Sequence, residues 1–370
     1  MKVAFVFITM PVGGAEDFAI QVSKEFPAEV EVYFVCLRSL GVLGNELLAN
    51  GHNVTLVDVA GSKRLNFRGI WDLSRWFKKT GITVAHSQMY NAHTYAVPAA
   101  RLSRAVSVLH QQKTLARMKF HRAFIFWFLV RWATRIVALS ERTKRDLALA
   151  FAVPESKIEV VPNAVDRSQF FPCPDPAWKA TLRAQLGLDP EAFLIGGIAS
   201  LHRVKNHEAT LEMAATLRKK EGLDFRVLII GEGAQYDILK QRIVQLNLTN
   251  VAALLGVKRP VGPWMQALDL VVMPSLWEGQ PLALLQAMAC RLPIVASRIE
   301  GNIAALGAEH PGLFELEARA SYEELVQRVI TQPAFREELV RYQAKTDVPD
   351  TKSVAAHLLG VYKAARGGNH

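Results

Sequence analysis

Short apolar runs rich in β-branched residues alternate with amphipathic segments along the whole chain. The apolar runs are typical of buried strands, and the segments with a helical period between them are typical of surface helices. The strands predicted in the first half are Val3–Thr9, Val30–Cys36, Asn53–Val57, Ile82–His86, Val106–His110, Arg135–Leu139 and Ile158–Val161. The helices predicted between them are Ala15–Phe26, Leu43–Asn50, Arg68–Lys79, Ala92–Leu102, Phe120–Ala133 and Glu141–Phe151. This alternation indicates βαβ units and a mostly parallel sheet that helices cover on both faces.

The Pro-rich segment Phe170–Ala177 interrupts the pattern and is predicted to be a linker, after which a second alternation begins. Its predicted strands are Ala192–Ala199, Arg226–Gly231, Val251–Leu255, Leu270–Met273 and Ile294–Ser297. Its predicted helices are Asn206–Lys220, Ala234–Leu246, Pro263–Ala267, one that opens near Pro281, Ala320–Thr331, Pro333–Thr346 and Ser353–Ala365. We therefore expect an α/β protein with two doubly wound, Rossmann-like domains. The domains are predicted at 1–167 and 178–345, followed by a C-terminal segment at 346–370.

Composition narrows the class of protein. At 370 residues the chain is long enough for two cores, and half of its residues are hydrophobic. The balance of 44 basic against 34 acidic residues favours anionic partners. Three widely spaced cysteines, Cys36, Cys173 and Cys290, are interpreted as free thiols in a reducing compartment. The N-terminal residues are interpreted as a first strand rather than a signal peptide, because the apolar run is short and leads directly into a helix. No run reaches the length of about 18 apolar residues that a membrane span needs.

The stretch Val271–Ala289 predicts a buried strand, a polar turn and a helix. Such a junction directs backbone N–H groups and the positive end of a helix dipole outward, and it can therefore bind a phosphate or a hydroxyl. Glu278 lies on the turn beside Gly279, where a carboxylate can accept hydrogen bonds from sugar hydroxyls. Gln286 lies about two helical turns further on. An ordinary loop with a solvated glutamate is the alternative interpretation.

A basic loop, ASLHRVKNH at 199–207, follows the first strand of the second half. Arg203 and Lys205 are suited to holding a diphosphate, arginine through its planar fork and lysine as a point charge. Gly231 ends the next strand in a Gly-Glu-Gly sequence, and its lack of a side chain permits close approach of a ligand to the backbone. A solvated basic loop and a simple tight turn are the alternatives for these two features.

The first half carries a glycine loop and several histidines at strand ends. Gly13 and Gly14 follow the first strand, where they let a substrate approach the N-terminus of the first helix. The loop does not match the dinucleotide fingerprint. His86, His93 and His110 lie at or just after strand ends, as candidates for hydrogen bonds to substrate hydroxyls or as packed core histidines. No D-x-D pair or His/Cys cluster suggests a metal, and we expect a reaction that needs neither a metal nor another cofactor.

The segment 101–135 combines Lys and Arg with aromatic residues, among them Phe124, Trp127 and Trp132. A basic, aromatic-rich helix can lie in a membrane interface with its cations at lipid phosphates. It can also pack as a core helix, and the residue pattern leaves both interpretations open. Binding to nucleic acid is not expected, because the basic residues are dispersed and no recognised module is present.

Taken together and in this order, the motifs resemble those of glycosyltransferase family 4, the retaining nucleotide-sugar glycosyltransferases of GT-B fold. The resemblance covers nearly the whole chain. It rests on PVGGAE at 11–16, VVPNAVD at 160–166, ASLHRVKNH at 199–207, IIGEG at 229–233, LLGVKR at 254–259, PSLWEGQPLALLQAMA at 274–289 and LPIVAS at 292–297.

The resemblance implies transfer of a sugar from a nucleotide-sugar to an acceptor with retained configuration and without a metal. It implies two domains that face each other across a cleft, with the donor on the second domain, the acceptor on the first, and the C-terminal helix crossing back to the first. Glu278 would contact hydroxyls of the donor sugar, and His86 or His110 would serve as the catalytic histidine. The predicted donor-binding residues are Gly13, Gly14, Arg203, Lys205, Gly231, Gly279, Gln280, Pro281, Leu282 and Gln286.

Three positions depart from the family pattern. Gln286 stands where the family usually has a second glutamate that binds the ribose, and an amide loses the strength of a charged acceptor. Ser200 stands where the family often has an arginine, which leaves Arg203 to take its place. Gln88 stands where the family often has a second histidine, so that the first-domain catalytic role falls to His86 or His110.

We expect a cytoplasmic hexosyltransferase that acts in polysaccharide or lipopolysaccharide biosynthesis on a glycan or glycolipid acceptor. Contact of segment 101–135 with anionic lipid would place it on the inner face of the cell membrane. Two alternatives stay open: a catalytically weak homologue that serves as a binding or scaffold partner, which Gln88 and Gln286 motivate, and a nucleotide-sugar 2-epimerase of the same two-domain shape.

Overall fold

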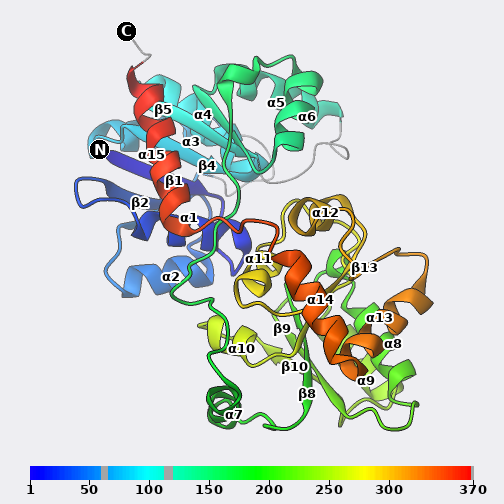
Figure 1. Cartoon of the computed structure of the whole chain (residues 1–370). Helices are drawn as coiled ribbons and strands as arrows, with labels where there is room; N and C mark the ends of the chain where they lie inside the picture. Colours follow the sequence, from blue (N-terminus) through cyan, green and yellow to red (C-terminus); the bar gives the residue numbers. More distant parts are fainter. Residues whose placement is uncertain (60–65, 112–119, 368–370) are drawn as a thin grey trace. The chain divides into compact units, whose positions relative to one another are not determined.

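The computed structural model describes residues 1–59, 66–111 and 120–367 (Figure 1). The chain divides into two compact units. Unit 1 comprises Met1–Ala164 and Pro349–His370, and unit 2 comprises Val165–Val348. The last segment of the chain therefore belongs to the first unit, although the whole of unit 2 separates the two in sequence.

Unit 1 is built on a parallel sheet. Its described residues form seven strands in the order β3-β2-β1-β4-β5-β6-β7. The strands are β1 (Lys2–Phe7), β2 (Glu31–Cys36), β3 (Val54–Leu56), β4 (Val84–Gln88), β5 (Val106–Gln111), β6 (Arg135–Ala138) and β7 (Ile158–Val160). Each neighbouring pair runs parallel, as the crossover helices between consecutive strands require.

Helices cover the faces of this sheet. They are α1 (Gly14–Lys24), α2 (Gly41–Ala49), α3 (Phe67–Thr80), α4 (Met89–Ser103), α5 (Phe120–Trp132), α6 (Glu141–Phe151), the 3-10 turn η1 (Glu155–Lys157) and α15 (Thr351–Gly367). Figure 1 shows α15, in red, lying along unit 1 beside α1. Its Leu358 and Tyr362 are buried in one core cluster with Phe5 of β1 and Phe18 of α1. Apolar burial therefore holds the C-terminal helix on unit 1.

Unit 2 repeats the architecture with a smaller sheet. Its six strands, which lie wholly within described residues, have the order β10-β9-β8-β11-β12-β13. They are β8 (Phe193–Ile198), β9 (Phe225–Ile230), β10 (Ala252–Gly256), β11 (Leu270–Met273), β12 (Ile294–Ser297) and β13 (Leu313–Phe314). The helices are α7 (Pro176–Gln185), η2 (Arg203–Lys205), α8 (His207–Leu217), α9 (Tyr236–Gln245), α10 (Gly262–Gln266), α11 (Leu282–Ala289), α12 (Glu300–Leu306), α13 (Arg319–Thr331) and α14 (Pro333–Gln343).

Each sheet reverses its strand order at one place. In unit 1 the reversal lies between β1 and β4, and in unit 2 it lies between β8 and β11. At such a switch point the loops that leave two adjacent strands diverge to opposite faces, and the crevice between them is where doubly wound folds bind ligands. The predicted α/β class with two Rossmann-like domains is confirmed, and the topology designates one edge in each unit as a candidate site.

The structure differs from the sequence prediction in a few elements. The segment Phe170–Ala177 is not a linker between the units, because the chain passes into unit 2 at Val165 and Phe170 is buried in the core of that unit. Pro172 and Pro174 disfavour helix and strand, but they do not prevent the burial of an aromatic side chain, and Pro176 begins helix α7. Helices α7 and α12 and the two-residue strand β13 are additional elements that were not predicted.

Candidate functional site

Two loops meet at the switch point of unit 2. One follows β8 and contains Arg203 and Lys205, and the other follows β11 and contains Glu278. The backbone N–H of Leu276 donates to the carbonyl of Val204 at 2.8 Å, which ties the second loop to the first. The Asn206 side chain adds a hydrogen bond to the carbonyl of Pro274 at 3.1 Å. The two loops therefore form one bonded structure at the carboxyl ends of the strands.

The Glu278 carboxylate lies at the centre of this structure and is only 7% exposed. Its Oε1 accepts a hydrogen bond from Lys205 Nζ at 2.6 Å and another from Ser275 Oγ at 2.8 Å. Its Oε2 has no partner among the described residues. A buried carboxylate is stable only when it is paired and hydrogen-bonded. Lys205 and Ser275 meet that need at one oxygen, and the other oxygen can accept hydrogen bonds from a ligand.

Buried polar groups behind Glu278 hold its loop in place. Ser297, at the end of β12, donates through Oγ to the carbonyl of Ser275 at 2.6 Å. Asn302 of α12 in turn donates through Nδ2 to the carbonyl of Ser297 at 2.9 Å. A Cβ added to Gly301 would lie 2.6 Å from the Glu278 carbonyl, so that this glycine lets α12 pack directly against the loop. This supporting set was missed from the sequence, because no local motif links β12 and α12 to the turn at 274–279.

Gly231 and Gly233 are needed for the packing of the basic loop. Gly231 has φ +148°, and a Cβ there would lie 2.0 Å from the carbonyl oxygen of Ala199. Gly233 has φ +156°, and a Cβ there would lie 2.4 Å from the carbonyl oxygen of Leu201. Both positions therefore require glycine for backbone conformation and for space. The sequence predicted a close approach of a ligand at Gly231, and that contact stays a prediction; the structure shows that the 199–201 backbone approaches Gly231 and Gly233.

The remaining predicted residues of unit 2 lie around the same edge. Arg203 is exposed, while Gly279, Gln280 and Leu282 are partly exposed. Pro281 is the N-cap of α11 and gives its first turn no side-chain hydrogen bond, which leaves N–H groups at the helix start available to a ligand. The side chain of Gln286 is partly exposed one helical turn beyond Leu282, on the face of α11 that is not buried.

The switch point of unit 1 carries the glycine loop. Gly13 is the N-cap of α1, and Gly14 is its first residue. A Cβ at Gly13 would lie 2.6 Å from the Glu16 carboxylate, which folds back over the start of the helix. Gly41 is a further required glycine that the sequence did not indicate. It has φ +69°, and a Cβ there would lie 2.4 Å from the carbonyl of Met10 in the β1 loop.

The structure brings His86 and His110 together inside unit 1. His86 Nε2 lies 3.2 Å from His110 Nδ1, and His86 Nδ1 lies 2.5 Å from the hydroxyl of Tyr362. Both imidazoles are fully buried, and His110 Nε2 has no hydrogen-bond partner in the described part of the chain. Gln88 lies beside them, with its amide nitrogen 3.4 Å from His86 Nε2. Neither histidine presents a ring nitrogen to solvent in this conformation.

Burial sets the charge state of these histidines. It lowers the pKa of His86 well below 6.5, and the neighbouring His110 and His93 lower it further. It also lowers the pKa of His110 to about 3. His93 has a pKa of about 3 for the same reason, with a smaller effect of His110, and its Nδ1 lies 2.8 Å from Ser87 Oγ. All three are neutral at pH 7. His86 and His110 bond to each other, while His93 bonds to Ser87. A catalytic role for His86 or His110 stays a prediction.

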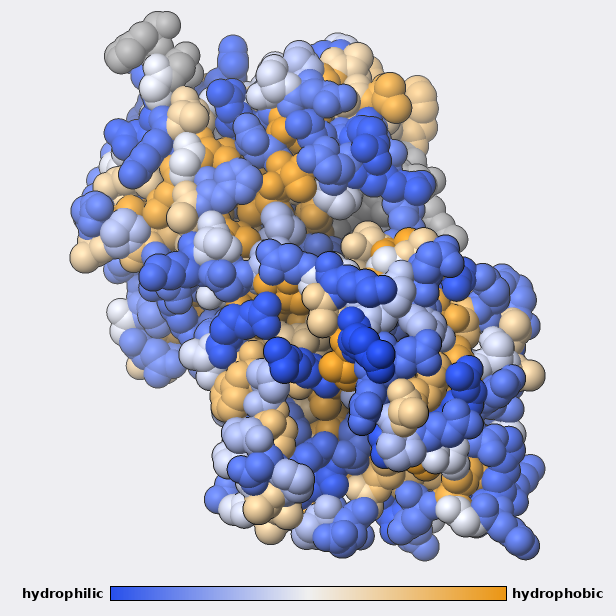
Figure 2. All heavy atoms as spheres, in the orientation of Figure 1, coloured by the Kyte–Doolittle hydropathy of each residue, from blue (hydrophilic) through white to orange (hydrophobic). Residues whose placement is uncertain are grey.

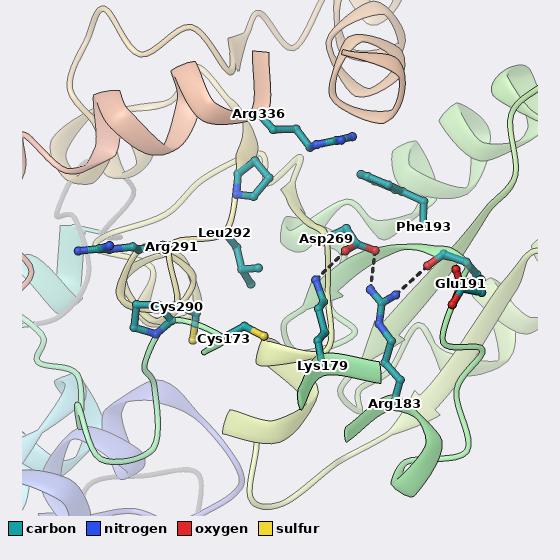
Figure 3. Close-up of a pocket in the computed structure, with 13 residues that line it drawn as sticks. Cys173, Lys179, Arg183, Glu191, Phe193, Asp269, Cys290, Arg291, Leu292 and Arg336 are labelled. Carbon is teal, nitrogen blue, oxygen red and sulfur yellow. Dashed lines mark hydrogen bonds and ion pairs between the residues drawn. The ribbon is translucent and has the colours of Figure 1, made fainter. Parts of the chain in front are cut away.

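A separate hollow of about 540 Å³ opens at the opposite edge of the sheet in unit 2, near the amino ends of β8, β11 and β12 (Figure 3). Asp269 is surrounded there by cations, with Lys179 Nζ at 2.6 Å and Arg183 Nη2 at 2.5 Å. It also accepts from the backbone N–H of Leu194 at 2.7 Å. Arg183 uses its other donors on three carbonyls, those of Ala267, Pro190 and Ala192. This ion-pair network fastens α7 to the sheet, and the cysteines Cys173 and Cys290 that line the hollow are free thiols.

Segment 101–135 is described except for 112–119, which lie outside the described residues. Helix α5 buries three side chains, Phe126, Leu129 and Val130. Most of its other aromatic residues are exposed. One face of α5 is therefore a core face, as one of the two interpretations held, and the rest of the helix is directed outward.

The described residues contain neither a metal-binding cluster nor a membrane-spanning helix. No group of three or more His, Cys, Asp or Glu side chains is arranged to hold a metal ion in residues 1–59, 66–111 and 120–367. Among the described helices, none combines the length and apolarity needed to cross a bilayer.

Comparison with known proteins decides the family. Residues 12–169 match the family model "Glycosyltransferase Family 4", and residues 179–346 match the model "Glycosyl transferases group 1". The chain belongs to glycosyltransferase family 4. These matches cover both units and include the Gly13 loop, the basic loop and Glu278.

One similar relative is the UDP-Gal:alpha-D-GlcNAc-diphosphoundecaprenol alpha-1,3-galactosyltransferase of Escherichia coli. It is 28% identical over 343 residues, which are 89% of this chain and 88% of the relative. Among solved structures, Anabaena HepE in complex with UDP and glucose has a TM-score of 0.83 at 18% identity and covers 98% of this chain and 100% of its own. WaaG, described as a glycosyltransferase involved in lipopolysaccharide biosynthesis, has a TM-score of 0.73 at 14% identity, with 97% and 99% covered. The structural likeness supports the GT-B fold.

This family 4 glycosyltransferase therefore has its most complete polar site at the switch point of unit 2. Lys205, Arg203 and the start of α11 supply positive charge and free donors, which suits an anionic group such as a diphosphate. The Glu278 carboxylate supplies a buried acceptor a short distance away, which suits a hydroxyl. The geometry brings together the residues that the sequence predicted separately in two loops 73 positions apart.

Proposed function

We propose that this glycosyltransferase moves a hexose from a UDP-hexose to a glycan or lipid-linked glycan acceptor, with retention of the anomeric configuration and without a metal. The observation that carries the proposal is the Lys205–Glu278 ion pair at the switch point of unit 2. It joins a diphosphate-binding cation to a sugar-binding carboxylate. The E. coli relative is named for a UDP-Gal donor and a diphosphoundecaprenol acceptor, and the HepE structures are named for UDP and UDP-glucose.

In this proposal Lys205 and Arg203 bind the diphosphate of the donor. When the bond between the sugar and the diphosphate breaks, the electron pair moves to the leaving phosphate, and fixed cations stabilise the charge that develops there. Two cations and the positive start of α11 can stabilise the negative charge on the leaving diphosphate, as a metal ion does in other enzymes. We therefore propose a metal-independent reaction. Gly231 supports the binding of the diphosphate because its lack of a side chain allows the basic loop to lie close to β9.

Glu278 would accept hydrogen bonds from hydroxyls of the donor sugar through Oε2. Because Lys205 and Ser275 hold Oε1, the orientation of the carboxylate is fixed before the sugar binds, and such preorganisation reduces the cost of binding. Gln286 would bind the ribose through its amide, as a neutral acceptor where the family usually has a charged one. Gly279, Gln280, Pro281 and Leu282 would lie against the donor through their backbone.

We assign the acceptor to unit 1, where Gly13 and Gly14 open the first helix at the switch point. We further propose a peripheral contact between the 101–135 segment and an anionic membrane, supported by the exposed aromatic side chains of α5. A lipid-linked acceptor would be presented at such a surface. His86 and His110 are proposed to act here only if Tyr362 and Gln88 release them, because both rings are buried.

The experiment that tests this function is a transfer assay with UDP-, GDP- and ADP-hexoses and a panel of lipid-linked glycan acceptors, followed by NMR of the product linkage. The proposal predicts transfer from a UDP-hexose, in EDTA, to give a product with the anomeric configuration of the donor. An inverted product would contradict the retention of configuration. A reaction abolished by EDTA and restored by a divalent cation would contradict the independence of a metal. Absence of any nucleotide binding in calorimetry would favour a scaffold protein instead.

A further inference from the structure

A cationic hollow of about 550 Å³ opens in unit 1 at the amino-end edge of the sheet. Its basic lining residues are Arg101 of α4, Arg131 of α5, Arg135 of β6 and Lys157 of η1. No acidic residue lines it, and none of the four cations forms an ion pair within residues 1–59, 66–111 and 120–367. Four positive charges around one hollow repel each other, and an anion bound between them would offset this repulsion.

The pKa of Lys157 reflects the positive charges that surround it. Burial lowers the pKa of Lys157, and the charges of Arg135, Arg131 and Arg101 lower it further. Lys157 Nζ donates to the carbonyl of Arg131 at 2.6 Å, at the C-terminal end of α5. Arg131 Nη1 donates to the carbonyl of Phe151 at 2.9 Å. These two cations therefore also support the ends of helices, and a change at either would affect folding.

Arg101 and Arg135 do not support a helix end in this way. Arg101 is exposed, and its guanidinium lies 5.9 Å from the centre of the Trp132 ring. Arg135 makes one hydrogen bond, from Nη1 to the adjacent carbonyl of Thr134 at 3.2 Å. Most donors of both guanidinium groups are therefore available to an anion, and a planar fork is well suited to phosphate oxygens.

An apolar surface adjoins the hollow along α5. A second hollow of about 360 Å³ is lined only by Phe120, Ala123, Phe124, Trp127, Ala150 and Phe151. Phe120 is 89% exposed and Phe124 is 58% exposed. Figure 2 shows apolar side chains gathered on this part of unit 1, over α5 and α6. The Arg131 guanidinium stacks 3.7 Å from the ring centre of Trp127 and so joins the apolar hollow to the cationic one.

We propose that the cationic hollow binds the phosphate of an anionic phospholipid headgroup while the aromatic face of α5 inserts into the membrane interface. The site rests on the proposed membrane contact and deepens it, since it names the headgroup-binding residues and adds Lys157, which lies outside 101–135. A lipid supplies the phosphate and the apolar chain together, which matches a cationic hollow beside an apolar one. Helix α5 is 13 residues long, about 20 Å, and runs from the carboxyl-end edge of the sheet to this site at the amino-end edge.

The test is sedimentation of the full chain with vesicles of phosphatidylglycerol and phosphatidylcholine, compared with vesicles of phosphatidylcholine alone. The proposal predicts binding that requires phosphatidylglycerol and weakens with salt. One cation near a membrane surface contributes about 1 kcal/mol, a factor of about five. We therefore expect the double variant Arg101→Gln/Arg135→Gln to bind about 25-fold more weakly, with an unchanged melting temperature. Phe124→Ser should weaken binding by a similar factor and leave its salt dependence unchanged.

The matched control is Arg341→Gln in unit 2, which removes an exposed arginine of α14 and should leave vesicle binding as it is. An equal loss from Arg341→Gln would overturn the proposal, because overall charge would then explain binding. A chain that ignores vesicles, and whose Lys157 is protected from acylation by inorganic phosphate, would show a free-phosphate site and overturn the lipid assignment. Sugar transfer to a soluble acceptor, measured without vesicles, reports the proposed catalytic function independently of this site.

Discussion

Glu278 is the residue on which the proposed site depends most. It is buried, and its stability comes from one lysine and one serine on a single oxygen. Pairing with Lys205, which is itself partly exposed, offsets the cost of burying the Glu278 carboxylate before any donor binds. In the proposed site, Lys205 and Ser275 hold Oε1, and Oε2 accepts hydrogen bonds from the donor sugar.

We predict that Glu278→Gln lowers kcat/KM for the UDP-hexose about 100-fold while the affinity for UDP changes less than about threefold. A hydrogen bond to a charged group contributes about 1.5–3 kcal/mol, and the variant loses it only where the sugar is present. Steady-state kinetics and calorimetric titration with UDP measure the two effects. Glu309→Gln, at an exposed position of the same unit, is the matched control. A loss of UDP affinity equal to the loss of kcat/KM would place Glu278 at the nucleotide instead of the sugar.

Gln286 gives a second prediction at the scale of one residue. It lies partly exposed on α11, and none of the described side chains forms a hydrogen bond with it. If it binds the ribose, Gln286→Glu should tighten UDP about five- to tenfold, because a charged acceptor makes a stronger hydrogen bond than an amide. Calorimetry measures the change. Unaltered affinity would mean that the ribose lies elsewhere.

At this scale the sequence indicated the chemistry of single residues better than their surroundings. Lys205 and Glu278 could be predicted because a cation and a carboxylate each followed a strand at a turn. Their contact, and the support from Ser275, Ser297 and Asn302, depends on which strands are neighbours. His86 also followed a pattern, but its burial against Tyr362 joins residues 276 positions apart, and no local signal predicts that.

At the scale of elements, two loops and a glycine turn form the proposed donor edge of unit 2. We predict that Gly231→Ala lowers the free energy of unfolding by more than about 2 kcal/mol, since its Cβ would overlap a backbone carbonyl and its φ disfavours a side chain. It should also weaken UDP binding at least tenfold by displacing the 199–205 loop. Urea unfolding and UDP titration measure these effects.

Gly222→Ala is the matched control for that prediction. Gly222 also has a positive φ, +76°, but a Cβ there would meet no atom within 4 Å. We expect only the cost of the backbone conformation, about 1 kcal/mol, and unchanged UDP binding. Equal effects of the two substitutions would show that backbone strain, and not the close packing of the basic loop, is what Gly231 relieves.

Most helices and strands followed from periodicity, and the exceptions have physical reasons. Helix α12 is short, and Gly301, which lowers helix propensity, is required for its contact with the Glu278 loop. Helix α7 begins at Pro176, inside the Pro-rich segment Phe170–Ala177, because a proline is favoured in the first turn of a helix, whereas a run of prolines is also typical of a linker. Strand β13 has only two residues, too few for a periodic pattern.

At the scale of the whole molecule, buried neutral histidines connect stability to pH. Burial lowers the pKa of His93 and His110 to about 3, and the pKa of His207 and His310 to about 4. Above pH 6.5 the folded and unfolded chains are both neutral at these positions, and no pH dependence arises. Below pH 6.5 the unfolded chain binds protons that the folded chain does not bind until about pH 3–4, so that stability falls as the pH falls.

We therefore predict that lowering the pH from 7 to 5 destabilises the protein by about 2 kcal/mol for each buried histidine. Urea unfolding at the two pH values measures this difference. His93→Gln should reduce the difference by about the contribution of one histidine, while His52→Gln, at an exposed position, should leave it unchanged. A difference that does not respond to His93→Gln would mean that another group controls the acid sensitivity.

The proposed function of the whole molecule depends on where the donor binds. The most direct measurement is a crystal structure of the chain with a UDP-hexose. We predict the diphosphate within hydrogen-bond distance of Lys205 Nζ, the hexose hydroxyls at Glu278 and the ribose beside Gln286. A nucleotide bound in another place, such as the hollow around Asp269 at the opposite edge of the sheet, would contradict the central claim.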